Sequence, residues 1–111
     1  MNKYPKRGDV YWVNLDPTMG TEIKKRRPCV IISNDAANEM GRRVVVAPIT
    51  STVNQIYPFQ VKVEIQGKSG KALLDQIRAV DKLRLSNRII SLDKITMHQI
   101  DKALKISLGL T

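Results

Sequence analysis

The fold of this chain is indicated first by the stretch FQVKVEIQGKSG at residues 59–70. Apolar and polar residues alternate between Phe59 and Ile65, which is typical of a strand with one buried and one solvent-facing side. The segment GKSG at 67–70 is rich in turn-forming residues and predicts a hairpin turn. Residues 71–74 are then expected to return as the partner strand, which predicts an antiparallel sheet.

Further stretches favour strands because they are rich in Val, Ile and aromatic residues. They are residues 10–15, 29–32 and 43–49 and, with an ambiguous pattern, 77–85. Pro48 has no amide N–H and predicts an edge position or a bulge near the end of its strand. Asn34 and Asp35 suit a turn or the N-cap of a short helical turn over 36–40. The polar, increasingly basic residues 18–26 predict a long mobile loop.

A helix is expected near the C-terminus. The sequence TMHQ at 96–99 matches a capping box, with Ile95 and Ile100 as its hydrophobic staple. Gly109 suits the position that follows the last helical turn. One apolar stripe is expected to face the sheet, formed by Met97, Ile100, Leu104 and Leu108. Five or six short strands followed by one helix predict an α+β, mainly β fold: a small antiparallel barrel with a helix against it.

The chain has 111 residues and a formal net charge of +9, from 19 Lys and Arg against 10 Asp and Glu. This length fits a single domain over 1–111 that can bury a core without a disulfide or a metal. No apolar run approaches the ~20 residues of a membrane span, and residues 1–7 have no secretory signal pattern. The single cysteine, Cys29, fits a reducing, cytoplasmic setting.

The composition also excludes several mechanisms. With one His and one Cys, the chain cannot use two histidines or build a Cys/His zinc site. It has neither a P-loop nor a GxGxxG stretch, so no metal and no cofactor is expected. The strong positive charge favours an anionic partner; the alternative is a charge that serves only solubility.

The densest charge lies in the sequence KKRR at 24–27. Four adjacent cations repel one another unless they meet an anion, and phosphate suits both Lys and Arg; the alternative is a solvated loop. Arg27 precedes Pro28, which favours an extended backbone leading into a buried strand. We therefore expect Arg27 to be anchored and Lys24 and Lys25 to be mobile. An anchored cation at this place is suited to stabilising charge in a transition state.

Other polar residues near this segment have two interpretations each. Glu22 is the one carboxylate in the basic loop. It either forms a surface ion pair or acts as a general base. The hydroxyls of residues 50–52 bond either the local backbone or a phosphate oxygen. Tyr57 stacks either on a base or over a small core. Asp81 is expected to form a structural ion pair, and Trp12 and Phe59 are expected to fill the core.

Several motifs then occur in a fixed order. They are RGDVYWV at 7–13, DPTxGTE at 16–22, RPxVIIS at 27–33, PIT at 48–50, YPFQV at 57–61 and DQIRxVDKxRL at 75–85. Each one is weak, but the ordered set is specific and spans about Lys6 to Leu108. Together they resemble the MazF/PemK/Kid family of toxin–antitoxin ribonucleases.

The resemblance implies a small SH3-like β-barrel with a C-terminal helix, CcdB/MazF-like, assembled as a homodimer. It implies metal-independent, sequence-selective cleavage of single-stranded RNA, chiefly mRNA, with 2′,3′-cyclic phosphate and 5′-OH products. It also implies an acidic, MazE-like antitoxin that binds the basic groove. Base selectivity is expected in the loops at 18–26 and 51–58.

The same resemblance suggests site residues. Arg27 matches the family's catalytic arginine, Thr50 its catalytic threonine and Glu22 a glutamate implicated in some members. Asp75 matches the acidic residue of the Kid branch, but Leu73 stands where that branch has an arginine, and the branch's histidine has no counterpart. Arg27 with Thr50 is therefore favoured. The candidates for RNA contact are Lys24, Lys25, Arg26, Ser51, Thr52, Tyr57, Asp75 and Gln76.

Two alternatives remain at this point. A CcdB-like toxin that binds DNA gyrase has a similar fold, but it would dock through its C-terminal helix and need no Arg/Thr pair. The end of this chain, ISLGLT at 106–111, has no aromatic anchor. A plain RNA-binding barrel would bind the same RNA and leave it uncut.

Overall fold

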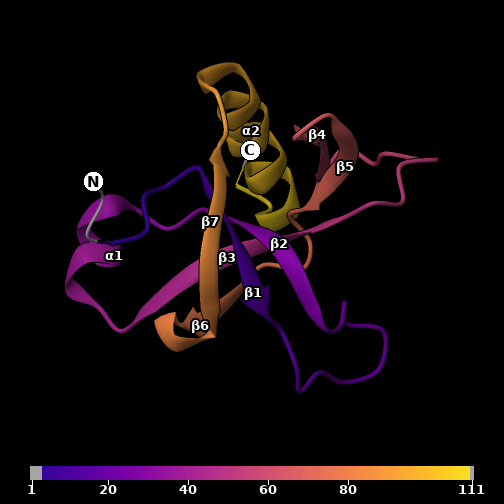
Figure 1. Cartoon of the computed structure of the whole chain (residues 1–111). Coiled ribbons are helices and arrows are strands. Elements are labelled where there is room, and N and C mark those ends of the chain that lie inside the picture. Colours follow the sequence, from indigo (N-terminus) through magenta and orange to yellow (C-terminus); the bar gives the residue numbers. More distant parts are fainter. Residues whose placement is uncertain (1–3, 111) are drawn as a thin grey trace.

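A computed structural model describes residues 4–110 of the chain. These residues form seven β-strands in one antiparallel sheet, two α-helices and one 3₁₀-helix (Figure 1). The strands are β1 (Asp9–Asn14), β2 (Arg26–Ile31), β3 (Arg43–Thr50), β4 (Gln60–Ile65), β5 (Lys68–Leu73), β6 (Arg78–Asp81) and β7 (Leu85–Ser91). The helices are α1 (Asp35–Met40), the 3₁₀-helix η1 (Lys82–Arg84) and α2 (Lys94–Leu108).

The sheet is strongly curled and has the order β4-β5-β3-β2-β1-β7, with β6 also paired to β3 (Figure 1). This confirms the mainly β fold with a C-terminal helix. Within residues 4–110, the terminal strands β4 and β7 do not pair with each other, so the barrel is only half closed.

The β4–β5 hairpin confirms the alternation predicted for residues 59–65, because Val61 and Val63 are buried and Lys62 and Glu64 are exposed. The predicted turn over 67–70 is wrong. The turn residues are Gln66 and Gly67, at φ +52° and +80°, and Ile65 already pairs with Lys68. Two successive positive φ values match the twist of the flanking strands, which makes this tighter turn favourable.

The ambiguous stretch at 77–85 holds β6 and η1, and it is followed by β7, a strand that the sequence pattern did not predict. Asp81 causes the break: its Oδ1 accepts a hydrogen bond from the amide of Leu83 at 2.8 Å and caps η1. The ion pair expected for Asp81 is therefore wrong. Within residues 4–110 the ion pairs are Arg7–Asp101 and Arg88–Asp9.

Pro48 lies at a change of partner strand within β3. Residues 43–46 of β3 pair with β6, and residues 49–50 pair with β5. Pro48 stands between these two segments and opposite Cys29 of β2. The missing N–H of Pro48 is thus accommodated by an interruption of the ladder near the end of β3. Of the two predicted explanations, an edge or a bulge, the edge is wrong, because β3 has partners on both sides.

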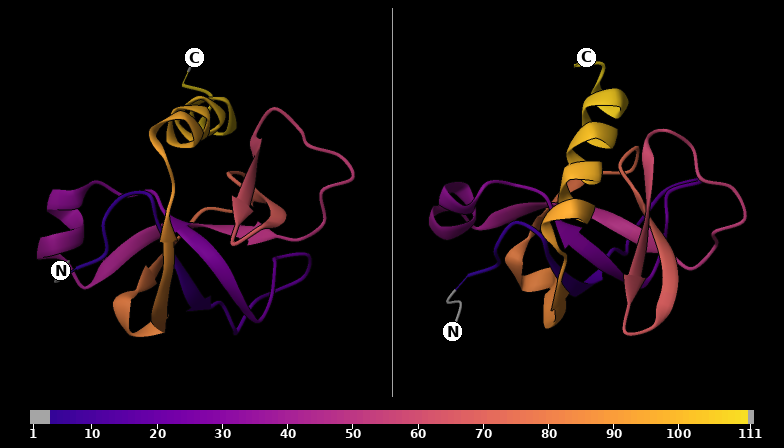
Figure 2. Two further views of the ribbon diagram at one scale, coloured as in Figure 1. Left: turned by 45° about the horizontal axis from the view of Figure 1, so that its top comes forward. Right: turned by 90° about the horizontal axis from the view of Figure 1, so that it is seen from above.

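Two hydrophobic cores lie on opposite faces of the sheet. The first is formed between the sheet and α2 and includes Val10, Val30, Val63 and Ile100. The second lies under β6 and includes Val13, Ile31 and Val80. The alternation of side chains along β1, β2 and β3 supplies both cores from the same strands. The views of Figure 2 show α2 lying across one side of the sheet.

The start of α2 differs from the prediction. Asp93 is the N-cap, and its Oδ1 accepts a hydrogen bond from the amide of Thr96 at 2.7 Å. Thr96 is already inside the first turn, so the capping box at 96–99 is wrong. Ile95 is 74% exposed and forms no staple. The predicted end is confirmed, because Gly109 has φ +69° and its amide bonds the carbonyls of Lys105 and Ile106.

The predicted apolar stripe of α2 is confirmed in its middle only. Ile100 is fully buried, Met97 and Leu104 are partly buried, and Leu108 is 51% exposed. No helix within residues 4–110 is both long enough and apolar enough to cross a membrane.

We expect Asp93→Ala to lower the midpoint of thermal unfolding more than Thr96→Ala does, because Asp93 is the cap. The hydrogen bond from the Thr96 amide holds the pKa of the Asp93 carboxyl below its usual value. The stabilisation is therefore complete above the usual carboxyl pKa and is lost as the pH falls through the lowered value. Circular-dichroism melts at neutral and acidic pH should show the wild type and Asp93→Ala converging at acidic pH. Equal effects of the two substitutions would contradict this assignment.

A second prediction concerns the close approach of β5 to the end of β3. A Cβ atom built on Gly70 would lie 2.9 Å from the Thr50 carbonyl oxygen and 3.0 Å from Ile49 Cγ2. Gly70→Ala should lower the free energy of unfolding by about 1–3 kcal/mol through overpacking. Urea denaturation measures this, with Ser69→Ala at the exposed neighbouring position as the control. An unchanged stability of Gly70→Ala would show that the two strands separate freely.

Candidate functional site

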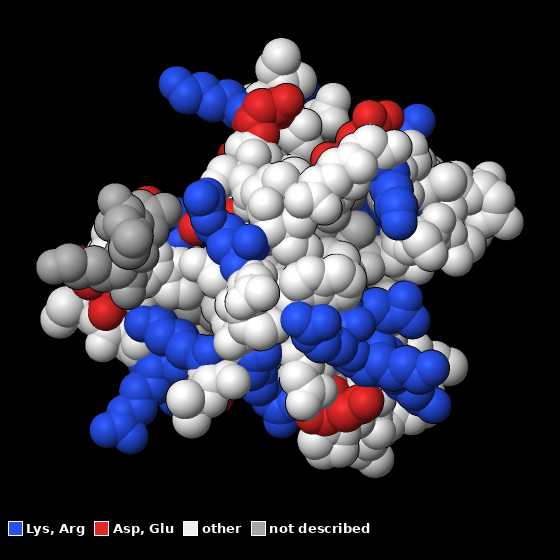
Figure 3. Space-filling model, viewed as in Figure 1, with Lys and Arg blue, Asp and Glu red and all other residues white. Residues whose placement is uncertain are grey.

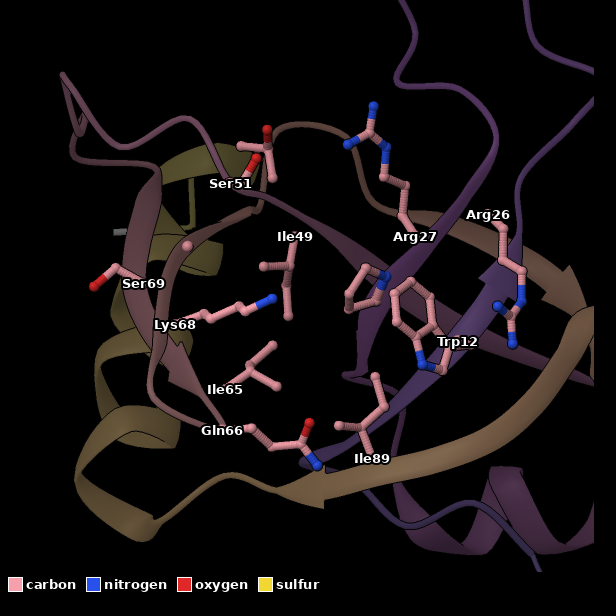
Figure 4. Close-up of a pocket in the computed structure, with 13 residues that line it drawn as sticks. Trp12, Arg26, Arg27, Ile49, Ser51, Ile65, Gln66, Lys68, Ser69 and Ile89 are labelled. Carbon is pink, nitrogen blue, oxygen red and sulfur yellow. The ribbon is translucent and has the colours of Figure 1, made fainter.

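A pocket of about 460 Å³ opens at the end of the sheet where β2, β3 and the β4–β5 hairpin meet (Figure 4). Its volume lies in the range of small-ligand sites. Its apolar wall contains Trp12, Pro28, Ile49, Ile65 and Ile89, and its polar groups come from Arg26, Arg27, Thr50, Ser51, Gln66, Lys68 and Ser69. The pocket thus combines cations, hydroxyls and an aromatic ring.

Arg27 and Thr50 come together because β2 and β3 are neighbouring antiparallel strands. The paired residues run from Ile31 and Val46 to Cys29 and Pro48. Two residues further along, this register places Arg27 opposite Thr50, and residues directly opposite point to the same face of a sheet. Both residues line the pocket.

The side chain of Arg27 is held at its inner nitrogen. The Nε donates a hydrogen bond to the Lys24 carbonyl at 3.1 Å, and the residue is half-buried at the start of β2. This confirms that Arg27 is anchored. Within residues 4–110, the terminal Nη groups have no protein acceptor, so both can reach an anion in the bidentate way that guanidinium groups favour.

The hydroxyls that follow β3 have a local role as well. Thr50 Oγ1 accepts a hydrogen bond from the Thr52 amide at 3.3 Å, as the structural interpretation of these residues expected. That bond occupies an acceptor site and leaves the Thr50 hydroxyl proton available to a ligand. Ser51 is exposed, and Figure 4 shows it at the rim toward which the Arg27 side chain extends.

Glu22, Asp75 and Gln76 line a second hollow of about 380 Å³, together with Arg78. The structure therefore brings Glu22 together with Asp75 and does not bring it into the pocket of Arg27 and Thr50. Glu22 Oε1 accepts a hydrogen bond from the Met19 amide at 2.5 Å, and Gln76 Oε1 accepts one from the Ile23 amide at 2.9 Å. Both side chains thus support the loop between β1 and β2.

The other candidates lie outside the lining of both hollows. Lys24 and Lys25 are exposed on the β1–β2 loop, where the Lys25 amide donates to Asp16 Oδ1 at 3.0 Å. Thr52 and Tyr57 are exposed on the β3–β4 loop. The Tyr57 ring stacks on the Phe59 ring with centroids 5.6 Å apart. Phe59 is only partly buried, so the expectation that it fills the core is wrong.

Basic side chains gather over the start of β2. Figure 3 shows this cluster on the right of the face drawn, next to a smaller acidic group. Lys24 to Arg27 supply four consecutive cations at this place. Their proximity to the pocket raises the local concentration of anions and favours a phosphate-bearing ligand.

Trp12 was expected in the core, and this is wrong. It is half-buried, lines the pocket opposite Pro28, and carries the Arg26 guanidinium 4.8 Å from its ring centroid. Arg26 Nη2 is held in turn by Ser86 Oγ at 3.1 Å. The alternating pattern of β1 predicts which face of the sheet Trp12 lies on. It does not predict that there is a pocket on this face.

Lys68 is a second pocket residue that the sequence did not suggest. Figure 4 shows its ammonium pointing into the pocket from the β4–β5 hairpin. The predicted turn over 67–70 includes Lys68, so the sequence pattern places this residue in a turn and not in a strand beside the pocket. A turn at Gln66 and Gly67 makes Lys68 the first residue of β5, where it pairs with Ile65 and is exposed at the mouth of the pocket.

Cys29 does not supply a nucleophile. It is fully buried, and burial raises the pKa of its thiol to about 12, whereas a reactive cysteine needs a lowered pKa and access to solvent. Residues 4–110 contain no cluster of three or more His, Cys, Asp or Glu side chains suited to a metal ion. The chemistry available in the pocket is that of guanidinium, ammonium and hydroxyl groups, which bind and stabilise a phosphodiester.

Comparisons with known proteins agree with this arrangement. Residues 6–108 match the family described as the PemK-like, MazF-like toxin of type II toxin–antitoxin systems. A mycobacterial endoribonuclease, solved in complex with its cognate antitoxin, is 29% identical, with 96% of this chain and 97% of that chain covered and a TM-score of 0.81.

MazF from Deinococcus radiodurans is 28% identical, with 97% of this chain and 99% of that chain covered and a TM-score of 0.86. A MazE–MazF structure from the same organism is also 28% identical, with 99% of this chain and 100% of that chain covered and a TM-score of 0.80. The family match covers nearly the whole chain, and the fold agrees over the same length. The chain therefore belongs to the PemK-like, MazF-like toxins of type II toxin–antitoxin systems.

Proposed function

We propose that this protein is a sequence-specific endoribonuclease that cleaves single-stranded RNA, chiefly mRNA, in the cytoplasm. The observation that carries the proposal is that Arg27 and Thr50 line the same pocket, which is flanked by the basic segment 24–27. The similar mycobacterial protein is an endoribonuclease, which supports the same activity.

In the proposed reaction, RNA supplies its own nucleophile. The ribose 2′-oxygen attacks the adjacent phosphorus, the bond to the 5′-oxygen breaks, and a 2′,3′-cyclic phosphate and a 5′-OH remain. One proton leaves the 2′-hydroxyl and one is delivered to the 5′-oxygen. The protein therefore needs no nucleophile of its own, but it must stabilise the extra negative charge of the pentavalent intermediate.

We assign that charge stabilisation to the free Nη groups of Arg27, together with a hydrogen bond from the Thr50 hydroxyl. Glu22 is the candidate general base. It lies in the second hollow, so this role requires the β1–β2 loop to release its Oε1 from the Met19 amide and to bring the carboxylate into the pocket of Arg27 and Thr50. The remaining candidates are assigned to RNA contact: Lys24, Lys25, Arg26, Ser51, Thr52, Tyr57, Asp75 and Gln76.

We further propose an acidic, MazE-like antitoxin as the inhibitor. The basic segment at 24–27 attracts acidic chains as well as phosphates, and solved MazE–MazF complexes are similar to this chain. A homodimer is also proposed. Ile106 and Leu108 in the last turn of α2, and Leu110 just after it, are 47%, 51% and 69% exposed, which is consistent with apolar residues covered in a subunit interface.

Arg27→Ala is expected to lower the rate of RNA cleavage by ~10²-fold or more, because it removes the main stabilisation of the transition state. The rate is measured with purified protein and a long single-stranded RNA whose new 5′ ends are mapped. Lys102→Ala removes one positive charge from the exposed side of α2 and serves as the control. Full activity of Arg27→Ala, with an unchanged melting temperature, would refute the assignment. Binding without any new 5′ ends in the wild type would instead indicate a plain RNA-binding protein.

Cleavage is expected to persist in excess EDTA, because none of the proposed steps uses a metal ion. The products should carry 2′,3′-cyclic phosphate ends, which resist ligation until they are opened and dephosphorylated. The control is a magnesium-dependent nuclease on the same RNA, which EDTA must stop. Loss of cleavage in EDTA and its recovery with Mg²⁺ would point to another mechanism.

A further inference from the structure

We propose that Lys71 is a positioning residue that ties down the β3–β4 connection, residues 51–59, and thereby sets how well this loop discriminates between RNA sequences. The part that concerns RNA rests on the proposed function above. The part that concerns the loop does not, so the two can fail separately.

The order of the strands explains why the β3–β4 connection needs a side chain to hold it. β3 and β4 are consecutive in the sequence, but β5 lies between them in the sheet. The connection therefore has to pass β5 to reach β4, and Figure 2 shows it as an extended loop beside the β4–β5 hairpin. Such a loop has no strand partner of its own, so side chains beneath it must hold it.

Lys71 is the β5 residue that does so. Its Nζ donates a hydrogen bond of 2.6 Å to the Gln55 carbonyl in the middle of the loop. Within residues 4–110 this is the hydrogen bond that reaches residues 53–56. The other loop contacts lie near its ends, where Thr52 bonds Thr50 and Tyr57 bonds Gln60.

The burial of Lys71 argues for a specific role. It is only 8% exposed, whereas Lys62, directly opposite on β4, is exposed. Burying an ammonium group is costly unless it is hydrogen-bonded, and an apolar side chain would fill the same place at lower cost. The charge-assisted bond to a backbone carbonyl accounts for a lysine at this position.

Lys71 is also next to the proposed catalytic pair. It is the register partner of Thr50 on β5. The β2–β3 register, continued two residues beyond Cys29 and Pro48, places Arg27 opposite Thr50 on β2. The three side chains therefore point to the same face of the sheet across three adjacent strands. Through Gln55, Lys71 links the position of the loop to the strand that carries Thr50, and so to the scissile phosphate.

Lys71→Met tests the tie, because Met retains the length and apolar stem of Lys and loses the ammonium. The amide hydrogen of Tyr57, which lies two residues beyond Gln55 and donates to Gln60 Oε1, should exchange about tenfold faster or more, the factor expected for the loss of a charged hydrogen bond. Exchange in α2 and β7 should stay unchanged. Lys62→Met, which removes a charge from the opposite exposed position, is the control and should alter neither segment.

In RNA cleavage, Lys71→Met should raise KM and reduce the preference among mapped cleavage sequences, with a smaller effect on kcat. Lys71→Arg retains a charged donor and should restore part of that preference. Unchanged exchange at the Tyr57 amide, or unchanged sequence preference together with faster exchange, would overturn the proposal. A decrease of about one in the slope of log affinity against log salt would show that Lys71 contacts phosphate directly, which also overturns it. If the wild type cleaves no RNA, the proposed function fails while the exchange experiment still tests the tie.

Discussion

The pairing of β3 with three other strands is the constraint on which the rest of the structure depends. β2 pairs along one side of β3, and the other side pairs first with β6 and then with β5. Pro48 marks the change of partner and has no N–H to offer there. The same strands separate the core under α2 from the core under β6, because their side chains alternate between the two faces of the sheet. The end of β3 also becomes the meeting point of the hairpin and the basic segment.

The geometry of the candidate site follows from this constraint. Antiparallel registers are set by whole residues, so the register of β2 with β3, continued to the end of β3, places Arg27 opposite Thr50. The pairing of β3 with β5 then brings Lys71 beside Thr50 and requires Gly70 at the close approach. A one-residue slip in either pair would turn these side chains to the opposite face. The proposed chemistry therefore depends on the backbone hydrogen bonds that set these two registers.

Local patterns in the sequence were reliable where one short interaction decides the outcome. The alternation from Phe59 to Ile65, the N-cap at Asn34 and the αL glycine at Gly109 all have the predicted roles. Patterns failed where two local signals compete. Thr96 has the sequence of a capping residue, but Asp93 caps the helix three residues earlier and encloses Thr96 in the first turn. At Asp81, the nearby basic residues suggested an ion pair, whereas its carboxylate caps η1.

The sequence by itself determined the fold class, the basic partner-binding character and the resemblance to a toxin family, because these depend on composition and on motifs in a fixed order. It also predicted that Arg27 is anchored, because a residue before proline extends into the strand that follows. Only the tertiary structure decided which candidates meet. Glu22 lies in a hollow with Asp75, whereas Arg27 and Thr50 share a pocket with Trp12 and Lys68. The physical reason is that strand register and loop crossing are long-range contacts, which no local pattern of residues encodes.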